Sequence, residues 1–538
     1  MKNNLNSNFK NILIKATFLL FATVLITGCN EDKFFELERP TQSPWNSVND
    51  LEFSVNDSYK ALFNSVVWQD PHAMTIVKDF VVSDLTDHIP DRLEHGFIFW
   101  YPRVFDKEST GTLDETSWQV LYRAVTAANA PLTFLEDKLE AGEDPFPGMT
   151  SADRETVKRQ MGELYLMRAF TYYIVSKHFL PPYSTDAANN VPVIPFNLRF
   201  QQNPDAIRTP NLASITEVYD QLVVDFQRAK DLLPASYSVQ GRGNKYAAAA
   251  SLYRIHWLMG NHDEALDELD YVINSGKFNL NEEPIAAWNR NFGEGEASEV
   301  IWERSENLNR LEAPRNLAWI TKVGHYRATN GGRDENHQHS WASSVHLSHW
   351  ACEKIGWMDP GTKEPTADAL ADKRYDQLYY FLKVIPEGGV PADFAPAEYE
   401  RQYLQQTKNA IWTDKFYRAA VGYNSQIPLI RLAELYLSRA TIRLQNGDVA
   451  GATADINVIR NRAGLGDFVG TLTENDIEIE RIKEMAGEGD RVFYLYGMNK
   501  PIDGNKFTQT GQAIPAIQPP YSQVFVKLPA SETNFLNN

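Results

Sequence analysis

Residues 427–464 read IPLIRLAELYLSRATIRLQNGDVAGATADINVIRNRAG, and this stretch decides the fold class. Its apolar residues recur at steps of three and four, which predicts two amphipathic helices. The first stripe is Ile430, Ala433, Leu437, Ala440 and Leu444, and the second is Val449, Ala452, Ile456, Ile459 and Ala463. Gly447 ends the first helix, Asp448 can cap the second, and Gly464 ends it. Such a hairpin cannot bury its apolar faces alone, so similar units are expected beside it.

The hairpin has counterparts elsewhere in the chain. Gly260 and Gly447 are each followed by apolar residues five, nine and twelve positions later. The segment GELYLMRA at 162–169 repeats AELYLSRA at 433–440 almost letter for letter. One such match would suit any helical protein that reuses Leu and Ala, but three partial matches favour tetratricopeptide-like repeats at irregular spacing. The sequence therefore predicts an all-α fold with helical repeats at about 117–276 and 427–496.

Three arginines lie in or just before the repeated ELYLxRA segments, namely Arg168, Arg431 and Arg439. Their recurring position favours ion pairs that bridge neighbouring repeats over binding of an anion. An exposed, unpaired arginine would contradict this hypothesis.

A long insertion separates the two blocks of repeats, at about 277–424. It is irregular, rich in Gly, Pro and His, and holds seven of the twelve tryptophans. Residues 68–115, which follow a predicted helix at 50–67, also lack a sustained period and are predicted to form long loops. Irregular segments on a regular scaffold commonly carry function, so the insertion is predicted to form the ligand face.

The overall charge excludes one large class of partners. The chain has 52 Lys and Arg against 70 Asp and Glu, a formal charge of -18, and no basic run. Nucleic acid is therefore not expected as a ligand, because phosphate backbones select clustered Lys and Arg.

The N-terminus predicts export and anchoring. Lysines precede an apolar run at 16–26 that is too short to span a bilayer, so residues 1–28 are predicted to be a signal peptide. The run ends in LITGC at 25–29, which resembles a bacterial lipobox and predicts lipidation of Cys29; an ordinary secretory signal with an incidental Cys is the alternative. Residues 29–48 are predicted to be a tether and 49–538 the folded domain. Cys352, the second cysteine, is predicted to be a buried small residue.

Several motifs resemble the SusD/RagB family of Bacteroidetes outer-membrane lipoproteins. The C-terminal motifs are the most specific: PLIRLAE at 428–434, Asn457 with RNRAG at 460–464, and Glu480-Arg481 followed by EGDR at 488–491. Earlier matches include Trp118, ELY at 163–165, VPVIP at 191–195 and GRG at 241–243. At 492–494 the chain has Val-Phe-Tyr where the family more often has Trp or Phe followed by Asp-Leu. The residues after Cys29, Asn-Glu-Asp, resemble the acidic signal that sends such lipoproteins to the cell surface.

The resemblance implies a role that the residue pattern alone does not. Such proteins bind an oligosaccharide or polysaccharide, or in some members a peptide, over a TonB-dependent SusC-like β-barrel transporter. They are not enzymes. The resemblance thus predicts a glycan-binding lipoprotein at the outer membrane, exposed at the cell surface, that passes its ligand to a transporter; a peptide or glycopeptide cargo is the alternative.

A sugar site needs aromatic planes for the ring face and polar side chains for the hydroxyl rim. The first predicted ligand segment runs from residue 84 to 101 and comprises Asp84, Asp87, Arg92, Phe99, Trp100 and Tyr101. The second lies in the insertion and comprises Trp319, Tyr326 and Trp341. For each aromatic the alternative is burial in the core.

Other chemistries have weaker signals. His337, His339, His346 and His349 are close in sequence, but no second cluster accompanies them, and no metal or cofactor is predicted. An oxygen-ligated structural calcium is left open, although no EF-hand pattern is present. A surface glycoside hydrolase would need paired carboxylates across a cleft, which a sequence with 70 acidic residues neither shows nor excludes. A purely structural repeat scaffold would leave the aromatic insertion unexplained.

Overall fold

The computed structural model describes residues 45–63, 71–88, 112–187, 190–201, 210–236, 239–288, 297–305, 345–384, 403–404, 409–413, 415, 426–503, 506–507, 513–521, 528–529 and 531–532. The chain divides into residues 1–50 and a second unit, residues 51–538, whose architecture follows. The predicted signal peptide, Cys29 and most of the predicted tether lie outside the described residues.

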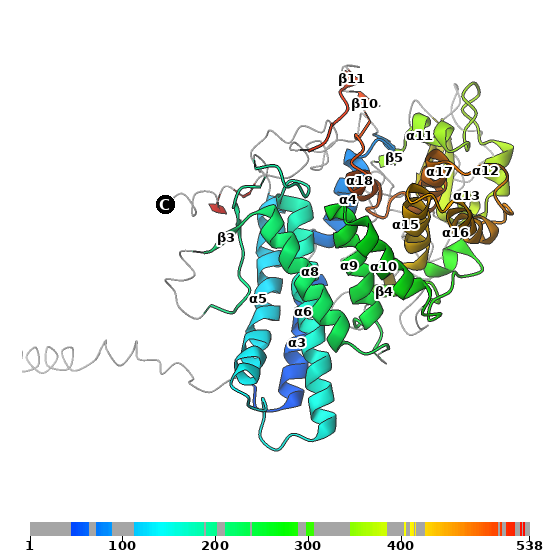
Figure 1. The fold of residues 1–538 in the computed structure, drawn as a ribbon. Coiled ribbons are helices and arrows are strands. Elements are labelled where there is room, and N and C mark those ends of the chain that lie inside the picture. The colour runs from blue at the N-terminus through cyan, green and yellow to red at the C-terminus, as the bar shows by residue number, and fades with distance from the viewer. Residues whose placement is uncertain are drawn as a thin grey trace, which may run out of the picture. The chain divides into compact units, whose positions relative to one another are not determined.

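A series of antiparallel helices forms the scaffold of the second unit (Figure 1). Successive helices pack on one another from α5 to α10, as the ribbon and the residue contacts both show. The series comprises α3 (Val48–Phe63), α4 (Pro71–Val82), α5 (Thr112–Glu140), α6 (Ser151–Phe179), α8 (Ile215–Leu232), α9 (Lys245–Met259) and α10 (His262–Ile273). The predicted all-α repeat fold is confirmed.

Tight glycine turns form the helical hairpins. Gly260 ends α9 with φ 75°, a left-handed conformation that Gly adopts without steric cost. Gly447, with φ 83°, lies between α15 (Leu432–Gln445) and α16 (Val449–Arg462). α10 packs against α15, so the repeats on either side of the insertion form one continuous stack. Ala433, Leu437, Ala440, Ala452, Ile456 and Ile459 share a single core cluster, as their spacing predicted.

Capping boxes fix where three helices begin. The side chains of Thr150, Ser214 and Thr473 each accept a hydrogen bond from the backbone N–H three residues later. In return, the backbone N–H of each donates to the acidic side chain of that later residue. The last of these starts α17 (Glu474–Met485), which α18 (Arg491–Gly497) follows. Local sequence therefore sets these boundaries independently of the core.

The arginines of the repeats bridge helices, as predicted. Arg168 on α6 donates to both carboxylate oxygens of Asp225 on α8, at 2.7 and 2.8 Å. Arg439 on α15 makes the same bidentate contact with Asp455 on α16 of its own hairpin, at 2.9 and 2.6 Å, and it also pairs with Asp270 on α10 of the neighbouring hairpin at 2.7 Å. Arg431 binds acidic residues of the α17 region. All three arginines are buried and paired.

The insertion is more regular than predicted. A five-stranded sheet has the order β1 (Thr86–His88), β5 (Val345–Leu347), β8 (Ala410–Thr413), β6 (Tyr379–Val384), β7 (Tyr403–Leu404), so four of its strands come from the insertion. Near the sheet are the short helices α11 (His349–Lys354), α12 (Ala367–Ala371) and α13 (Lys373–Leu378). Pairs β2 (Ile194–Pro195) with β3 (Leu212–Ala213), and β10 (Lys506–Phe507) with β11 (Ala513–Ile514), complete the smaller sheets. Short strands carry too little periodicity to be found in sequence.

Two further predictions were wrong. Residues 71–82 form α4, although 68–115 was predicted to be loops. Ile430 is part of a strand, not of the helical stripe, because β9 (Gln426–Arg431) pairs with β4 (Val300–Ser305) and α15 begins only at Leu432. The tertiary partner here overrides the apolar spacing that suggested a helix.

Most described tryptophans of the insertion are core residues. Trp288, Trp302, Trp357 and Trp412 are each no more than 2% exposed. Trp302 packs edge-on against Phe63 and Phe170, which joins β4 to the helical scaffold. These four side chains hold the insertion in place and are not available to a ligand.

Candidate functional site

The first predicted ligand segment continues from the end of β1, and the second leads into the start of β5, the strand paired with β1. β1 and β5 are antiparallel, and His88, the last residue of β1, is the partner of Val345, the first residue of β5. The segment with Arg92, Phe99, Trp100 and Tyr101 leaves the strand pair after His88. The segment with Trp319, Tyr326 and Trp341 enters it before Val345. These seven residues lie outside the described residues, but their two segments share one end of this strand pair.

Asp84 already has an intramolecular partner. It is 2% exposed, and its carboxylate accepts from Nε and Nη2 of Arg491 at 2.8 and 2.6 Å. Arg491 also contacts Glu478 at 3.0 Å. A ligand would have to compete with Arg491 for Asp84. Asp87 lies within β1 opposite His346, and its side chain is not among those described.

A chain of polar contacts fixes β1 to the helical scaffold. Thr86 Oγ1 donates to the carbonyl of Phe80 at 2.9 Å, which ties the strand to the end of α4. Asp79 on α4 accepts from the backbone N–H groups of Arg491, Val492 and Phe493 and so caps the start of α18. Burial raises the pKa of Asp79 to about 6. The strand end at His88 and Val345, hereafter the β1–β5 end, is thus held by α4 and α18.

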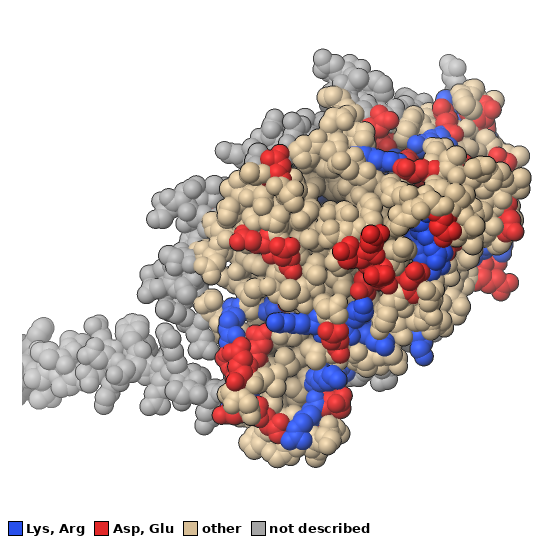
Figure 2. All heavy atoms as spheres, in the orientation of Figure 1, with Lys and Arg blue, Asp and Glu red and all other residues tan. Residues whose placement is uncertain are grey.

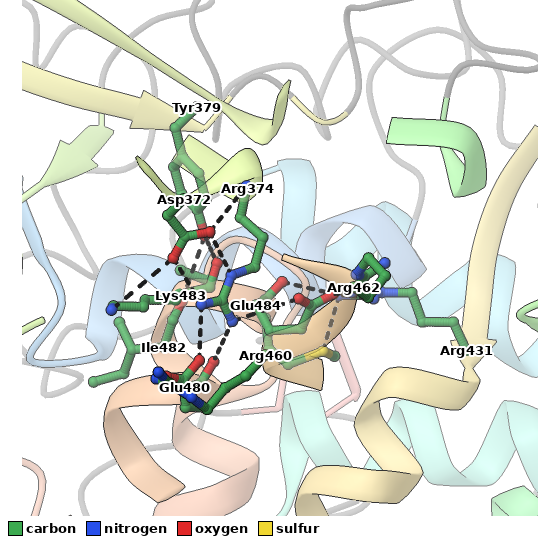
Figure 3. A network of polar contacts seen from close by, with 12 residues as sticks. Asp372, Arg374, Tyr379, Arg431, Arg460, Arg462, Glu480, Ile482, Lys483 and Glu484 are labelled. Atoms are coloured by element: carbon green, nitrogen blue, oxygen red, sulfur yellow. Dashed lines mark hydrogen bonds and ion pairs between the residues drawn. The ribbon is translucent and has the colours of Figure 1, made fainter. Parts of the chain in front are cut away.

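A buried network of charges holds the insertion on α17 (Figure 3). Arg374 on α13 donates to Asp372 and reaches Glu480 on α17 at 2.7 Å. The Glu484 carboxylate on α17 forms ion pairs with the guanidinium groups of Arg431 and Arg462. Burial alone would raise the pKa of Glu484, but these arginines lower it well below its usual value. Sequence analysis missed this network, whose only signal was the density of charges at 478–491 in a segment with apolar helical spacing.

The EGDR motif at 488–491 supplies three of these structural contacts. Glu488 accepts from Arg431 at 2.7 and 2.8 Å, and Asp490 binds Arg481 bidentately. Arg491 binds Asp84, as described above. This motif, one of those that carried the resemblance, therefore forms a junction between helices.

The histidines and the second cysteine show no metal chemistry in the parts of the chain that are described. His346 Nδ1 donates to the carbonyl of Leu347 at 2.8 Å, and His349 Nε2 donates to that of Asn409 at 2.7 Å. Within the described ranges, no group of three His, Cys, Asp or Glu residues is placed to hold a metal ion. His337 and His339 lie outside these ranges. Cys352 is fully buried, as predicted, and burial raises the pKa of its thiol.

The described helices also bear on the membrane prediction. Of the helices in the ranges given above, none is both long and apolar enough to cross a membrane.

Comparison with protein families gives two successive matches along the chain. A family described as "Starch-binding associating with outer membrane" (SusD-like) matches residues 86–257, from β1 to α9. The SusD family matches residues 299–496, from β4 to α18. The chain belongs to the SusD family. The assignment confirms the resemblance found in the sequence, and it agrees with the prediction that the chain is not an enzyme.

Individual SusD-family relatives are distant. SusD-like protein P2 of Formosa agariphila is 26% identical over 274 residues, which cover 50% of this chain and 48% of the relative. The starch-binding protein SusD of Bacteroides thetaiotaomicron is 46% identical over 69 residues, 13% of this chain and 12% of the relative. The matched part of the chain therefore spans about half the length of the first relative, and less of the second.

Solved structures share the fold along nearly the whole chain. A SusD superfamily protein from Bacteroides thetaiotaomicron has a TM-score of 0.66 at 19% identity and covers 91% of this chain and 98% of its own. Surface glycan-binding protein A from Bacteroides uniformis has a TM-score of 0.63 at 19% identity and covers 90% and 97%. At 19% identity these structures show that the fold is shared, and they show nothing beyond the fold.

Proposed function

We propose that this SusD-family protein binds a glycan at the β1–β5 end and delivers it to a β-barrel transporter in the outer membrane. The observation that carries the proposal is the pairing of His88 with Val345. It lets two aromatic-rich segments, far apart in sequence, contribute to one site. A glycan needs several ring platforms and polar rims together, and the second segment would add three aromatic side chains to the aromatic and polar residues of the first.

The names of relatives support a carbohydrate ligand. One matched family is described as starch-binding, and one solved structure is a surface glycan-binding protein. In the site proposed, Phe99, Trp100 and Tyr101 from one side and Trp319, Tyr326 and Trp341 from the other stack on sugar rings. Asp87 and Arg92 bind hydroxyl groups at the rim. Asp84 orients β1 through Arg491 and reaches the ligand only if that pair opens.

Binding to defined glycans tests the site. We expect the full chain, purified in detergent, to bind one polysaccharide of a panel saturably in calorimetry. Trp100→Ala and Trp319→Ala should each weaken that binding by about tenfold or more, because each removes a stacking contribution of roughly 0.5–1.5 kcal/mol together with the apolar area that the ring buries. Phe53→Ala is the matched control, since Phe53 is a 74% exposed aromatic on α3 outside both segments.

The outcomes separate the competing interpretations. Loss of binding in both tryptophan variants, with the Phe53 variant unchanged, supports the shared site. Loss in one variant only would confine the site to one segment. Binding of a peptide but no glycan would move the chain to the peptide-importing alternative, and release of shorter products from the glycan would indicate hydrolysis.

Anchoring and delivery are separate parts of the proposal. A lipid on Cys29, followed by the tether at 29–48, would hold the domain at the outer membrane beside the transporter. We expect Cys29→Ala to move the chain from the membrane fraction to the soluble fraction, with glycan binding unchanged. A variant that stays in the membrane fraction would contradict the lipid anchor. Recovery of a TonB-dependent β-barrel with the tagged chain, measured by mass spectrometry, tests the transporter.

A further inference from the structure

A second candidate site lies between α4, the C-terminal end of α6, α8, α18 and the tail at 519–521. It is a pocket of about 160 Å³. Engineered cavities of roughly 150 Å³ hold one six-membered ring, so this pocket has room for a single ring and not for a chain. Its aromatic and proline lining comprises Pro181, Pro182, Tyr183, Tyr219, Phe493, Tyr496, Pro519, Pro520 and Tyr521. None of the residues predicted from the sequence to bind ligand is in this lining.

Two tyrosine pairs form the walls. Tyr496 and Tyr521 have ring centroids 4.5 Å apart, and Tyr183 and Tyr219 have theirs 5.3 Å apart. The Tyr521 hydroxyl donates to the carbonyl of Lys500 at 2.6 Å, which fixes that ring in place. Tyrosine and proline faces present flat C–H and π surfaces, the kind of surface on which the apolar face of a sugar ring packs.

One wall carries an unused hydrogen-bonding group. The hydroxyl oxygen of Tyr496 is buried and has no hydrogen-bond partner among the described residues. A buried polar atom without a partner costs roughly 1–3 kcal/mol, so native proteins usually supply one, from the protein, from water or from a ligand. Because Tyr496 lines the pocket, a bound molecule can supply it.

The charged side chains that line the pocket already have partners within the protein. Lys78 donates to the carbonyls of Lys177 and His178, and the Asp79 carboxylate accepts three backbone N–H groups. Lys177 makes one long hydrogen bond, 3.5 Å to the carbonyl of Gly489, and lies 5.6 Å from the ring of Tyr173. Gly489 and Tyr173 line a neighbouring pocket and not this one, so Lys177 is not counted as a ligand donor here.

We propose that this pocket binds one sugar residue, with its ring between the two tyrosine pairs and one of its oxygens on Tyr496. This subsite rests on the proposed function but is separate from the β1–β5 end. It would hold a single terminal residue or a free monosaccharide, because the volume excludes more. Tyr496 donates to a ring or hydroxyl oxygen of that residue.

The test uses methyl glycosides of glucose, galactose, mannose, xylose, rhamnose and fucose, and free glucuronate, with the full chain. We expect at least one to bind saturably in saturation-transfer NMR. Tyr496→Phe, which removes only the hydroxyl, should weaken that binding by roughly fivefold, the worth of one net hydrogen bond. The same variant should unfold at a slightly higher temperature without ligand, since an unpartnered buried hydroxyl is gone.

The chain offers a matched control on the same helix. Tyr494 is fully buried, and its hydroxyl also lacks a partner among described residues, but it does not line the pocket. Tyr494→Phe should raise the unfolding temperature in the same way and leave sugar binding unchanged. Ser184→Phe, at a half-buried position of the pocket wall, should abolish monosaccharide binding by filling the pocket.

Different results would disprove the subsite and the proposed function. Trp100→Ala should remove polysaccharide binding and leave monosaccharide binding intact if both sites exist. Equal monosaccharide binding by wild type, Tyr496→Phe and Ser184→Phe would overturn the subsite, as would the absence of saturable binding by every sugar tested. Polysaccharide binding that depends on Trp100 would then still stand.

Discussion

The helical repeats and the junction between the insertion and α17 are both tightly packed, but they are held by different forces. In the repeats, apolar stripes pack against one another, and a single bidentate pair such as Arg168 with Asp225 crosses between helices. At the junction, Arg374, Arg431 and Arg462 converge on Glu480 and Glu484 of one helix, α17.

This difference separates two uses of buried charge. A buried ion pair can be replaced by apolar groups at little cost, but loss of one partner leaves an uncompensated charge. In the repeats the loss of Asp225 leaves one arginine, Arg168, without its carboxylate partner. At the junction Glu484 serves two arginines, so one substitution affects several contacts together. The junction should therefore be the more sensitive region.

The largest effect is expected from Glu484→Gln. The variant keeps the shape of the side chain but leaves Arg431 and Arg462 without this shared carboxylate. Each arginine keeps Glu299, and Arg431 also keeps Glu488. We expect the free energy of unfolding to fall by about 4 kcal/mol, because two buried guanidinium groups each lose one of their carboxylate partners. Chemical denaturation followed by circular dichroism measures it. A loss below about 1 kcal/mol would mean that the junction is not the sensitive region.

Removing an arginine from the repeats should lower the free energy of unfolding by less, and by different amounts at the two positions. Arg168→Leu removes a pair in which both side chains are no more than 2% exposed, and we expect a loss of about 3 kcal/mol. Arg439→Leu should cost about 2 kcal/mol, because its second partner, Asp270, is 36% exposed and can be rehydrated. The double variant Arg168→Leu with Asp225→Leu should recover part of the loss. Equal costs at both arginines would contradict the dependence on burial.

Acidification should weaken the link between the insertion and α17. Burial alone would raise the pKa of Glu478, but Arg491, Lys354 and Lys500 lower it from 4.5 to about 2. A lowered folded-state pKa stabilises the fold fully above pH 4.5, and this contribution is lost as the pH falls from 4.5 to 2. Wild type should thus lose more stability over this window than Glu478→Gln. Parallel profiles for the two proteins would refute the assignment.

The smallest effect is expected at an exposed pair. Arg154 and Asp144 are in contact, but their side chains are 52% and 44% exposed. On the face drawn in Figure 2, basic and acidic side chains are interspersed in this manner. Arg154→Gln should leave the unfolding temperature unchanged within error, since solvent screens such pairs. A clear loss would show that burial is not what separates the sensitive ion pairs from the rest.

Features of the helical repeats could be predicted from the sequence, whereas contacts at the junction could not. The helix break at Gly447 and the cap at Asp448 lie where the sequence predicted them, because apolar spacing, a glycine stop and a capping residue are local signals. The bridging role of Arg168 and Arg439 was also predictable, because the two segments repeat. Arg491 and Asp84 were not paired in advance, since they are 407 positions apart and no local pattern links them.

The candidate site was only partly accessible from sequence. Aromatic composition singled out Trp100 and Trp319, and these remain predictions. Composition could not separate them from Trp302 or Trp412, which are buried. Tyr183 and Tyr496 of the second pocket gave no signal, because each lies in an ordinary stretch and they become neighbours only through folding.

The sequence by itself determined the helical repeats, their glycine turns and the family, because these depend on residues within one or two helical turns or on contiguous motifs. Only the tertiary structure decided that β1 pairs with β5, that the insertion rests on a buried charge network, and that tyrosines from α8, α18 and the tail enclose a pocket. These features depend on contacts between distant segments. Short strands and isolated charges specify such contacts only when the packed core brings them together.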